Sequence, residues 1–137
     1  MSCDMSIDYG EIKRFVKAAD NASKVIVKEA KKAVRSVARD IVADVKANTR
    51  VDTGRLKHGF SMGNVLVSGS FVSATVANSV EYAPYIEYGH RIVDGERRTV
   101  GFWEGNSMLS KATENAEGKL KYKCRAIVKK VEEIIKV

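Results

Sequence analysis

The sequence contains few of the residues on which covalent crosslinks and metal sites depend. Its 137 residues include only two cysteines, Cys3 and Cys124, together with two histidines and one proline, Pro84. Two cysteines so far apart make neither a disulfide framework nor a cluster of Zn²⁺ ligands, which favours a reduced, cytoplasmic history. Walker loops, dinucleotide fingerprints and HExxH helices are missing as well. The sequence therefore predicts no cofactor and no metal site.

Long apolar runs are equally scarce. The first fifteen residues, MSCDMSIDYGEIKRF, contain no apolar core of a signal peptide, and no later segment is apolar enough to span a bilayer. Hydrophobic residues still make up 45% of the chain, which is enough for a modest core. The length fits one domain, so we expect residues 1–137 to fold as a single unit with no membrane contact.

The charge is positive overall and unevenly distributed. There are 24 Lys and Arg residues against 17 Asp and Glu residues, which gives a net charge of +7. Residues 1–50 and residues 111–137 each carry a net charge of +4, whereas residues 51–110 carry −1. Basic terminal segments of this kind face nucleic acid, an acidic protein or only solvent. The distribution indicates basic helices on either side of a nearly neutral sheet.

The N-terminal third predicts helices over about residues 8–49. Ser6 or Asp8 can cap a short first helix, and Asp20–Ser23 is the expected break after it. Apolar residues then recur at three-and-four spacing, as in an amphipathic helix: Ala30, Ala33, Val34, Val37, Ala38, Ile41, Val42 and Val45. The opposite face of that helix is basic and contains Lys28, Lys31, Lys32, Arg35, Arg39 and Lys46.

Between about residues 55 and 104 the pattern changes to alternation with many β-branched residues, which is typical of strands. Residues 56–62 are predicted as a first strand. The run NVLVSGSFVSATVANS predicts a β-hairpin that turns at Ser68–Ser70. This segment therefore supplies a small antiparallel sheet.

Two further features complete the sheet region. Residues 82–88 contain Pro84, so we expect a loop or a single helical turn here rather than a central strand. Asp94–Gly95 is a turn signal inside residues 91–103, which predicts a second and longer hairpin with a charged tip.

A last helix is predicted over about residues 107–135. Asn106 or Ser107 can cap it, and Cys124 is expected as a small core residue on its apolar face. The whole pattern predicts an α+β fold with N-terminal helices, a small antiparallel β-sheet with hairpins, and a C-terminal helix packed on one sheet face.

Two patterns that can carry catalysis have weak support. Gly59–Gly63 matches the G-x-S-x-G pattern of esterases, but a strand pattern follows it where those enzymes have a helix. Glu81, Glu87 and His90 could ligate a metal, although their spacing matches no known ligand pattern. The residues favour a non-enzymatic protein, and an esterase is the last alternative.

The aromatic residues gather away from the basic helix. Tyr82, Tyr85, Tyr88 and Trp103 lie near glycines, as is common at protein–protein interfaces, although tyrosines also close the edge of a core. Aromatic side chains do not interleave with the lysines of residues 28–46, so a platform for stacking bases is unsupported. The basic helix could still lie against phosphates.

Two motifs in a fixed order resemble a known family. The first, V-x-T-G-x-L, is present as Val51, Thr53, Gly54 and Leu56. The second, Y-A-x-Y-x-E-x-G-T, is present as Tyr82, Ala83, Tyr85, Glu87 and Gly89, with His90 where many members have Thr. This ordered pair, between a basic helix and a final helix, resembles the tail-component family of long-tailed phages. That family includes the tail-completion, or head–tail joining, proteins of siphophages and related prophages.

The resemblance implies a non-enzymatic virion protein of the neck or tail, assembled in the bacterial cytoplasm. It implies a homo-oligomeric ring whose partners are other neck, connector and tail proteins, with packaged DNA as a further contact. We expect Gly54 to take the left-handed conformation that turns the chain from the basic helix into the sheet, while Leu56 enters the core. The candidate interface residues are Tyr82, Ala83, Tyr85, Glu87, Tyr88, Gly89 and Trp103.

Two alternatives remain beside this reading. One is a tail terminator or minor tail protein, which acts in the same virion. The other belongs to a different class and is a small basic nucleic-acid-binding protein, for which binding to DNA would weaken steeply with salt.

Overall fold

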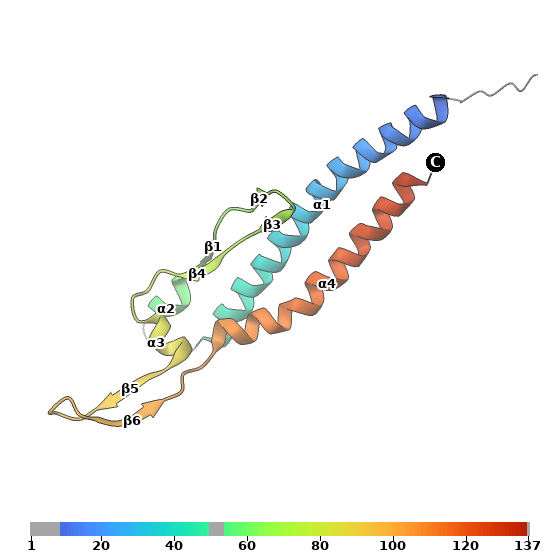
Figure 1. The fold of residues 1–137 in the computed structure, drawn as a ribbon. Coiled ribbons are helices and arrows are strands. Elements are labelled where there is room, and N and C mark those ends of the chain that lie inside the picture. The colour runs from blue at the N-terminus through green and yellow to red at the C-terminus, as the bar shows by residue number, and fades with distance from the viewer. Residues whose placement is uncertain (1–8, 50–53, 137) are drawn as a thin grey trace, which may run out of the picture.

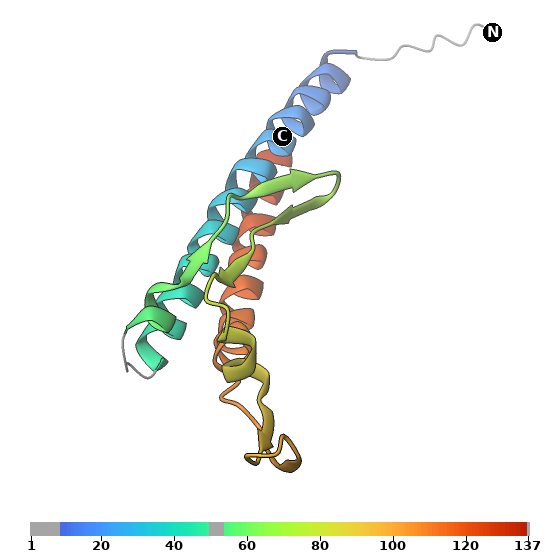
Figure 2. The same ribbon diagram turned by 90° about the vertical axis from the view of Figure 1, so that its left-hand side faces the viewer.

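The computed structural model describes residues 9–49 and 54–136, and two long helices dominate it (Figure 1). Helix α1 spans Tyr9–Asn48 and helix α4 spans Met108–Ile135. The two helices run side by side in opposite directions, and α1 extends beyond the end of α4 (Figures 1 and 2). Short helices and β-hairpins form the segment between them, so the α+β class is confirmed.

Helix α1 is continuous for 40 residues, so the break predicted at Asp20–Ser23 is wrong. An ion pair of 3.2 Å between Lys24 and Asp20 crosses the predicted break with the i,i+4 spacing of a helix. Ala22 is buried there, while its polar neighbours Asn21 and Ser23 are exposed. The helix contains no proline and no glycine after Gly10, and therefore nothing in this segment forces it to end.

Helix α4 packs mainly along α1, whereas the sequence placed it on a sheet face. Small side chains are buried on both helices, Ala33 on α1 and Ala112 and Ala116 on α4, and they let the two backbones approach closely. Two ion pairs also join the helices, Lys130 to Glu29 at 3.2 Å and Lys119 to Asp40 at 3.8 Å. Cys124 is exposed, so its prediction as a core residue is wrong.

Four short strands form two antiparallel ladders beside α1. Strand β1 (Phe60–Met62) pairs with β4 (Val76–Asn78), and β2 (Leu66–Ser68) pairs with β3 (Phe71–Ser73). The turn between β2 and β3 lies at Gly69–Ser70, which confirms the predicted hairpin. The second half of that hairpin is nevertheless divided between two ladders. Strands β1, β3 and β4 all contact α1.

The second predicted hairpin is also confirmed. Strands β5 (His90–Val93) and β6 (Thr99–Trp103) pair antiparallel, with an irregularity in register between Ile92 and Val93. We call this pair the long hairpin. It protrudes from the end of the molecule at which α4 begins (Figure 1). In the described residues the strands thus make three separate two-stranded ladders, where one small sheet was expected.

The chain after α1 departs from the prediction in detail. The expected strand 56–62 is divided between a short helix, α2 (Arg55–His58), and β1. Gly54 has a φ of 79°, the left-handed conformation predicted for it, but it precedes α2 instead of ending α1. Some predictions fall outside the described residues, namely the caps at Ser6 and Asp8 and the motif residues Val51 and Thr53.

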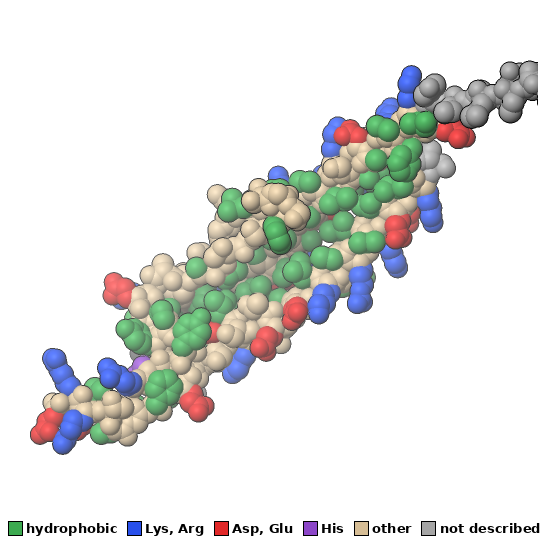
Figure 3. Space-filling view, viewed as in Figure 1, with side chains coloured by type: hydrophobic (Ala, Val, Ile, Leu, Met, Phe, Trp, Pro, Cys, Tyr) green, Lys and Arg blue, Asp and Glu red, His purple; other side chains and the backbone are tan. Residues whose placement is uncertain are grey.

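The hydrophobic core is small and lies where α1 ends and α4 begins. Its buried residues are Val45, Phe60, Met108 and Ala112, and the half-buried residues Ile41, Leu56, Ile86 and Leu109 pack against them. Leu56 therefore reaches the core, as predicted. Elsewhere hydrophobic side chains remain in view along the seam between the two long helices, and Lys and Arg side chains project from the outer edges (Figure 3).

Candidate functional site

The second sequence motif forms helix α3, Ala83–Tyr88, with Pro84 in its first turn, where a missing N–H is tolerated. This confirms the expected helical turn. The two sides of α3 differ, since Ala83 and Glu87 are buried and Tyr85 and Tyr88 are exposed. Together with the preceding residue, the exposed tyrosines make up what we call the tyrosine face: Tyr82, Tyr85 and Tyr88. The guanidinium of Arg55 lies 5.9 Å from the ring centroid of Tyr82.

The carboxylate of Glu87, which is only 7% exposed, caps helix α4. The backbone N–H of Leu109 donates to one oxygen at 2.9 Å, and the backbone N–H of Ser110 donates to the other at 3.0 Å. The first N–H groups of a helix lack partners within the helix, and a carboxylate is favoured there. Ser107 was a predicted cap, and although it lies at the N-cap it makes no side-chain cap hydrogen bond.

Backbone contacts fasten α3 to the loop before α4. The N–H of Asn106 donates to the carbonyl of Ile86 at 2.8 Å, and the N–H of Ser107 donates to the carbonyl of Glu87 at 3.1 Å. The chain crosses itself beside these bonds, at Gly89 and Gly105, which both have positive φ angles. A Cβ atom at Gly89 would overlap the carbonyl oxygen of Trp103. The motif glycine is therefore required by close approach of two backbone segments.

The long hairpin begins directly after this crossing. At its base the rings of His90 and Trp103 lie 5.5 Å apart between centroids. Phe102 pairs with Arg91, and Ile92 is the next residue along β5, so Phe102 and Ile92 point to opposite faces. Both side chains are exposed, as are Val93 and Val100. The hairpin thus presents apolar surface on its two faces.

The tip of the long hairpin is organised by Asp94. One oxygen of its carboxylate accepts hydrogen bonds from the backbone N–H groups of Glu96 and Arg98, each at 2.9 Å. The other oxygen accepts a hydrogen bond from Arg98 Nε at 2.9 Å. These bonds, chiefly the backbone bond from Arg98, hold the pKa of Asp94 below its ordinary value. The predicted turn is therefore built by one carboxylate.

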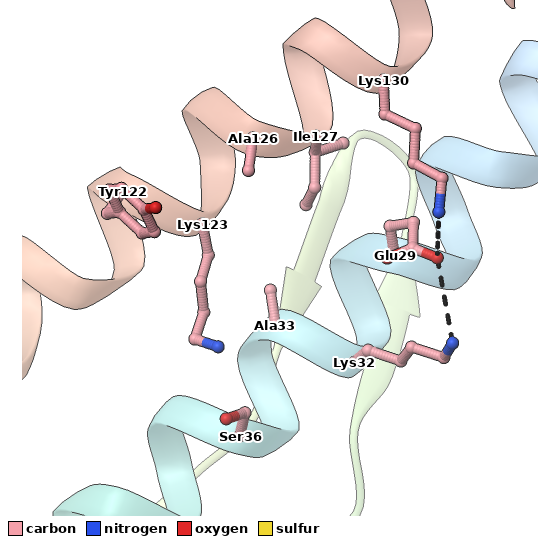
Figure 4. Close-up of a pocket in the computed structure, with 9 residues that line it drawn as sticks. All are labelled: Glu29, Lys32, Ala33, Ser36, Tyr122, Lys123, Ala126, Ile127 and Lys130. Atoms are coloured by element: carbon pink, nitrogen blue, oxygen red, sulfur yellow. Dashed lines mark hydrogen bonds and ion pairs between the residues drawn. The ribbon is translucent and has the colours of Figure 1, made fainter.

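The predicted basic face lies on α1. Lys28, Lys31, Arg35 and Arg39 are exposed, and Lys46 is half-buried. Its sixth member, Lys32, borders a groove of 420 Å³ between α1 and α4. In that groove the carboxylate of Glu29 lies between Lys32 and Lys130 (Figure 4). The hydrogen bond from Lys130 lowers the pKa of Glu29 below its ordinary value.

Residues of the esterase-like pattern and of the possible metal trio take part in contacts that hold the fold together. Ser61 is exposed in the middle of β1, and a turn and strands follow it where an esterase would have a helix. Gly59 lies against Asn78, whose side chain a Cβ atom would overlap. Of the metal trio, Glu87 caps α4, and the ring of His90 lies against Trp103 in a tilted arrangement. In the part of the chain that the structure describes, no three His, Cys, Asp or Glu residues are grouped to hold a metal ion.

Comparison with known proteins identifies the family. A family model described as "Bacteriophage HK97-gp10, putative tail-component" matches residues 13–89, which is more than half of the chain and includes most of α1, both motifs and α3. The chain belongs to this family of phage tail components. It is therefore a structural protein of the virion. No curated protein and no solved structure matches this tail component. Among its described helices, none is both long and apolar enough to cross a bilayer.

Sequence reasoning missed two residues of this tail component that position the candidate site. Asn78 donates a hydrogen bond to the carbonyl of Leu56 at 2.8 Å and accepts one from the N–H of Val80 at 2.8 Å, which ties α2 to β4. Asparagine is depleted in strands and often bonds to backbone groups, so its presence was an available signal. Gly105 had no such signal, because its need for glycine arises only where the chain crosses Gly89.

Proposed function

We propose that this tail component is a ring-forming subunit of the phage neck that completes the tail and joins it to the head. The observation that carries the proposal is the long hairpin. A two-stranded hairpin is marginally stable alone in water, and this one exposes apolar residues on both faces. A neighbouring subunit that buried Phe102, at present 61% exposed, would stabilise both partners.

The surface area supports assembly as well. The chain exposes 10761 Å², whereas a compact monomer of 15.1 kDa would expose about 7,100 Å². Large apolar side chains are exposed on the first half of α1 with Ile12, Phe15 and Val16, on the β2–β3 hairpin with Leu66 and Phe71, on the tyrosine face with the long hairpin, and on α4 with Tyr122 and Val128. Apolar surface on this scale is typical of interaction sites.

A ring requires two different patches on each subunit, because its interfaces are heterologous. Helix α3, which carries the tyrosine face, and the long hairpin lie at one end of the molecule, and the first half of α1 and the β2–β3 hairpin lie further along it (Figures 1 and 2). In a ring an angular error repeats at each subunit. The Glu87 cap and the Gly89–Gly105 crossing would keep the hairpin direction constant.

Deletion of the gene in its phage or prophage tests the proposal. Electron microscopy of lysates should then show filled heads beside detached tails of normal length, and supplying the gene in trans should restore complete particles. Tails of abnormal length would instead support a tail terminator, the alternative that uses the same exposed surfaces. Complete, infectious particles after deletion would contradict both roles.

A further inference from the structure

All ten Lys and Arg residues of α1 lie on one side of the helix. At 3.6 residues per turn they fall within an arc of about 100° around the helix axis. We call this set the basic stripe: Lys13, Arg14, Lys17, Lys24, Lys28, Lys31, Lys32, Arg35, Arg39 and Lys46. The acidic residues of α1 fall outside the arc: Glu11, Asp20, Glu29, Asp40 and Asp44. The stripe therefore carries charge of one sign along its whole length.

The continuity of α1 makes these ten residues a single surface. From Lys13 to Lys46 the stripe is about 50 Å long, because an α-helix rises 1.5 Å per residue. With the break that the sequence predicted at Asp20–Ser23, Lys13, Arg14 and Lys17 would have had no fixed direction relative to the rest. The unbroken helix aligns them with Lys24 and with the basic face that begins at Lys28.

The positive charge of the stripe is little neutralised within the protein, because two carboxylates of α1 form ion pairs with lysines of α4. Lys130 pairs with Glu29 and Lys119 pairs with Asp40, so these carboxylates are drawn towards α4. Within the described residues, only two members of the stripe make an ion pair. They are Lys24 with Asp20 at 3.2 Å and Lys32 with Glu29 at 3.8 Å, and surface pairs of this kind are weak.

The composition of the arc indicates the kind of partner. A protein–protein interface has an apolar centre, and a single-stranded nucleic acid site has aromatic rings for stacking. The arc contains no aromatic side chain, and Val42 is its one large apolar residue. Duplex DNA presents the matching surface, a line of phosphates with one charge per ~1.7 Å of axis.

We propose that the basic stripe of α1 binds the phosphate backbone of duplex DNA without reading its sequence. This role goes beyond the proposed place of the protein at the neck, and it does not require the ring. Contacts to phosphate position a protein on a duplex, whereas sequence is read by contacts to base edges. The binding site would therefore act on any duplex that passes along α1.

Fluorescence anisotropy with the purified full-length protein and a labelled 30-base-pair duplex tests this proposal. Affinity should fall steeply between 50 and 200 mM salt, with a log–log slope of about −4.5 if five cations contact phosphates. A duplex of scrambled sequence should bind equally well. Absence of binding at 50 mM salt would overturn the proposal, and so would tighter binding to polyglutamate than to the duplex.

The triple variant Lys31→Gln, Arg35→Gln and Arg39→Gln locates the site. Removal of three phosphate contacts should make the salt slope shallower by about 2.7. The side chains are exposed, so circular dichroism should be unchanged. Light scattering should show the oligomer of the unmodified protein, which separates this result from the fate of the proposed ring.

A matched control removes the same charge from α4 through Lys111→Gln, Arg125→Gln and Lys129→Gln, at three exposed positions. This variant should keep the slope of the unmodified protein. An equal loss in both triples would mean that net charge alone governs binding, and would overturn the assignment to α1.

A third triple tests whether the stripe is continuous. It combines three substitutions at the other end of α1: Lys13→Gln, Arg14→Gln and Lys17→Gln. This variant should also make the salt slope of DNA binding shallower. Full retention of the slope in this variant would contradict a single 50 Å surface. The three variants carry equal charge, so their comparison depends on position alone.

Discussion

Ser110 donates two hydrogen bonds to one carboxylate oxygen of Glu87, from its backbone N–H at 3.0 Å and from its hydroxyl at 2.9 Å. The two residues are 23 positions apart, and the bonds join helix α3 to the first turn of α4. These bonds attach α3, and with it the tyrosine face, to the long helix α4. A motif residue that sequence analysis places at an interface has this structural role within the subunit.

The Glu87 cap predicts a loss of stability on substitution. Glu87→Ala should lower the free energy of unfolding by about 1–3 kcal/mol, since it leaves two partly buried N–H groups of α4 without this acceptor. The stability of Glu87→Gln should lie between those of Glu87→Ala and the unmodified protein, because its amide oxygen can still accept one of the hydrogen bonds. Urea denaturation measures both. Glu81→Ala removes an exposed carboxylate of the same segment and should change stability by less than about 0.5 kcal/mol. Equal effects of the two alanine variants would contradict the capping role.

The backbone crossing at Gly89 predicts a graded series of glycine substitutions. Gly89→Ala should destabilise the protein by more than about 2 kcal/mol, because it combines a positive φ with overlap on the Trp103 carbonyl. Gly69→Ala has the positive φ alone, with open space around it, so it should cost about 1–2 kcal/mol. Gly95→Ala has neither feature and should be neutral or slightly stabilising. Thermal unfolding would show the order, and a Gly89 variant as stable as the Gly95 variant would refute the account.

The hairpin tip should respond to acid. The pKa of Asp94 in the folded protein is lower than 3.8, its ordinary value. A depressed pKa stabilises the folded tip fully above the unfolded pKa, and this contribution is lost as the pH falls through the folded pKa. NMR signals of the Glu96 and Arg98 amides should therefore stay constant down to about pH 4 and shift below it. In Asp94→Asn the same amides should lose this titration, and an unchanged titration there would assign it to another group.

The proposed assembly depends on the long hairpin. Phe102→Ser should convert the oligomer of the purified protein to a smaller species in light scattering, since it removes exposed apolar surface that a neighbour would bury. Circular dichroism should be unchanged because this side chain contributes little to the core. Tyr122→Ser, at a ring that is 74% exposed on α4, provides the control and should leave the mass unaltered. A Phe102 variant that assembles normally would remove the hairpin from the interface.

Much of the fold follows from local patterns. The three-and-four spacing from Ala30 to Val45 predicts the basic helix, and Asp94–Gly95 predicts the turn of the long hairpin. The error at Asp20–Ser23 arose from weighing polar capping residues above the lack of any helix-breaking residue. Cys124 has helical spacing with the buried Ala112 and Ala116, but between residues 121 and 128 only Lys123 and Ile127 are half-buried, so spacing alone could not decide its burial.

The candidate site was less accessible to sequence reasoning. The tyrosines and glycine of the second motif were singled out, yet the tie between Glu87 and α4 depends on a contact between residues far apart in the chain. The same holds for Gly89, whose constraint is set by Trp103. Patterns in one segment report its own conformation, whereas caps and crossings are properties of two segments brought together by the core.

The unbroken length of α1 also sets a rule for how this chain can vary. Insertion of one residue near Ala22 would rotate everything on one side of it by about 100°, and would turn Lys13 and Arg14 away from Lys28. Insertions of seven or eleven residues come close to whole turns and would preserve the alignment. Length changes in this helix should thus be tolerated only in such steps, because both halves of the helix must keep the same side towards their partners.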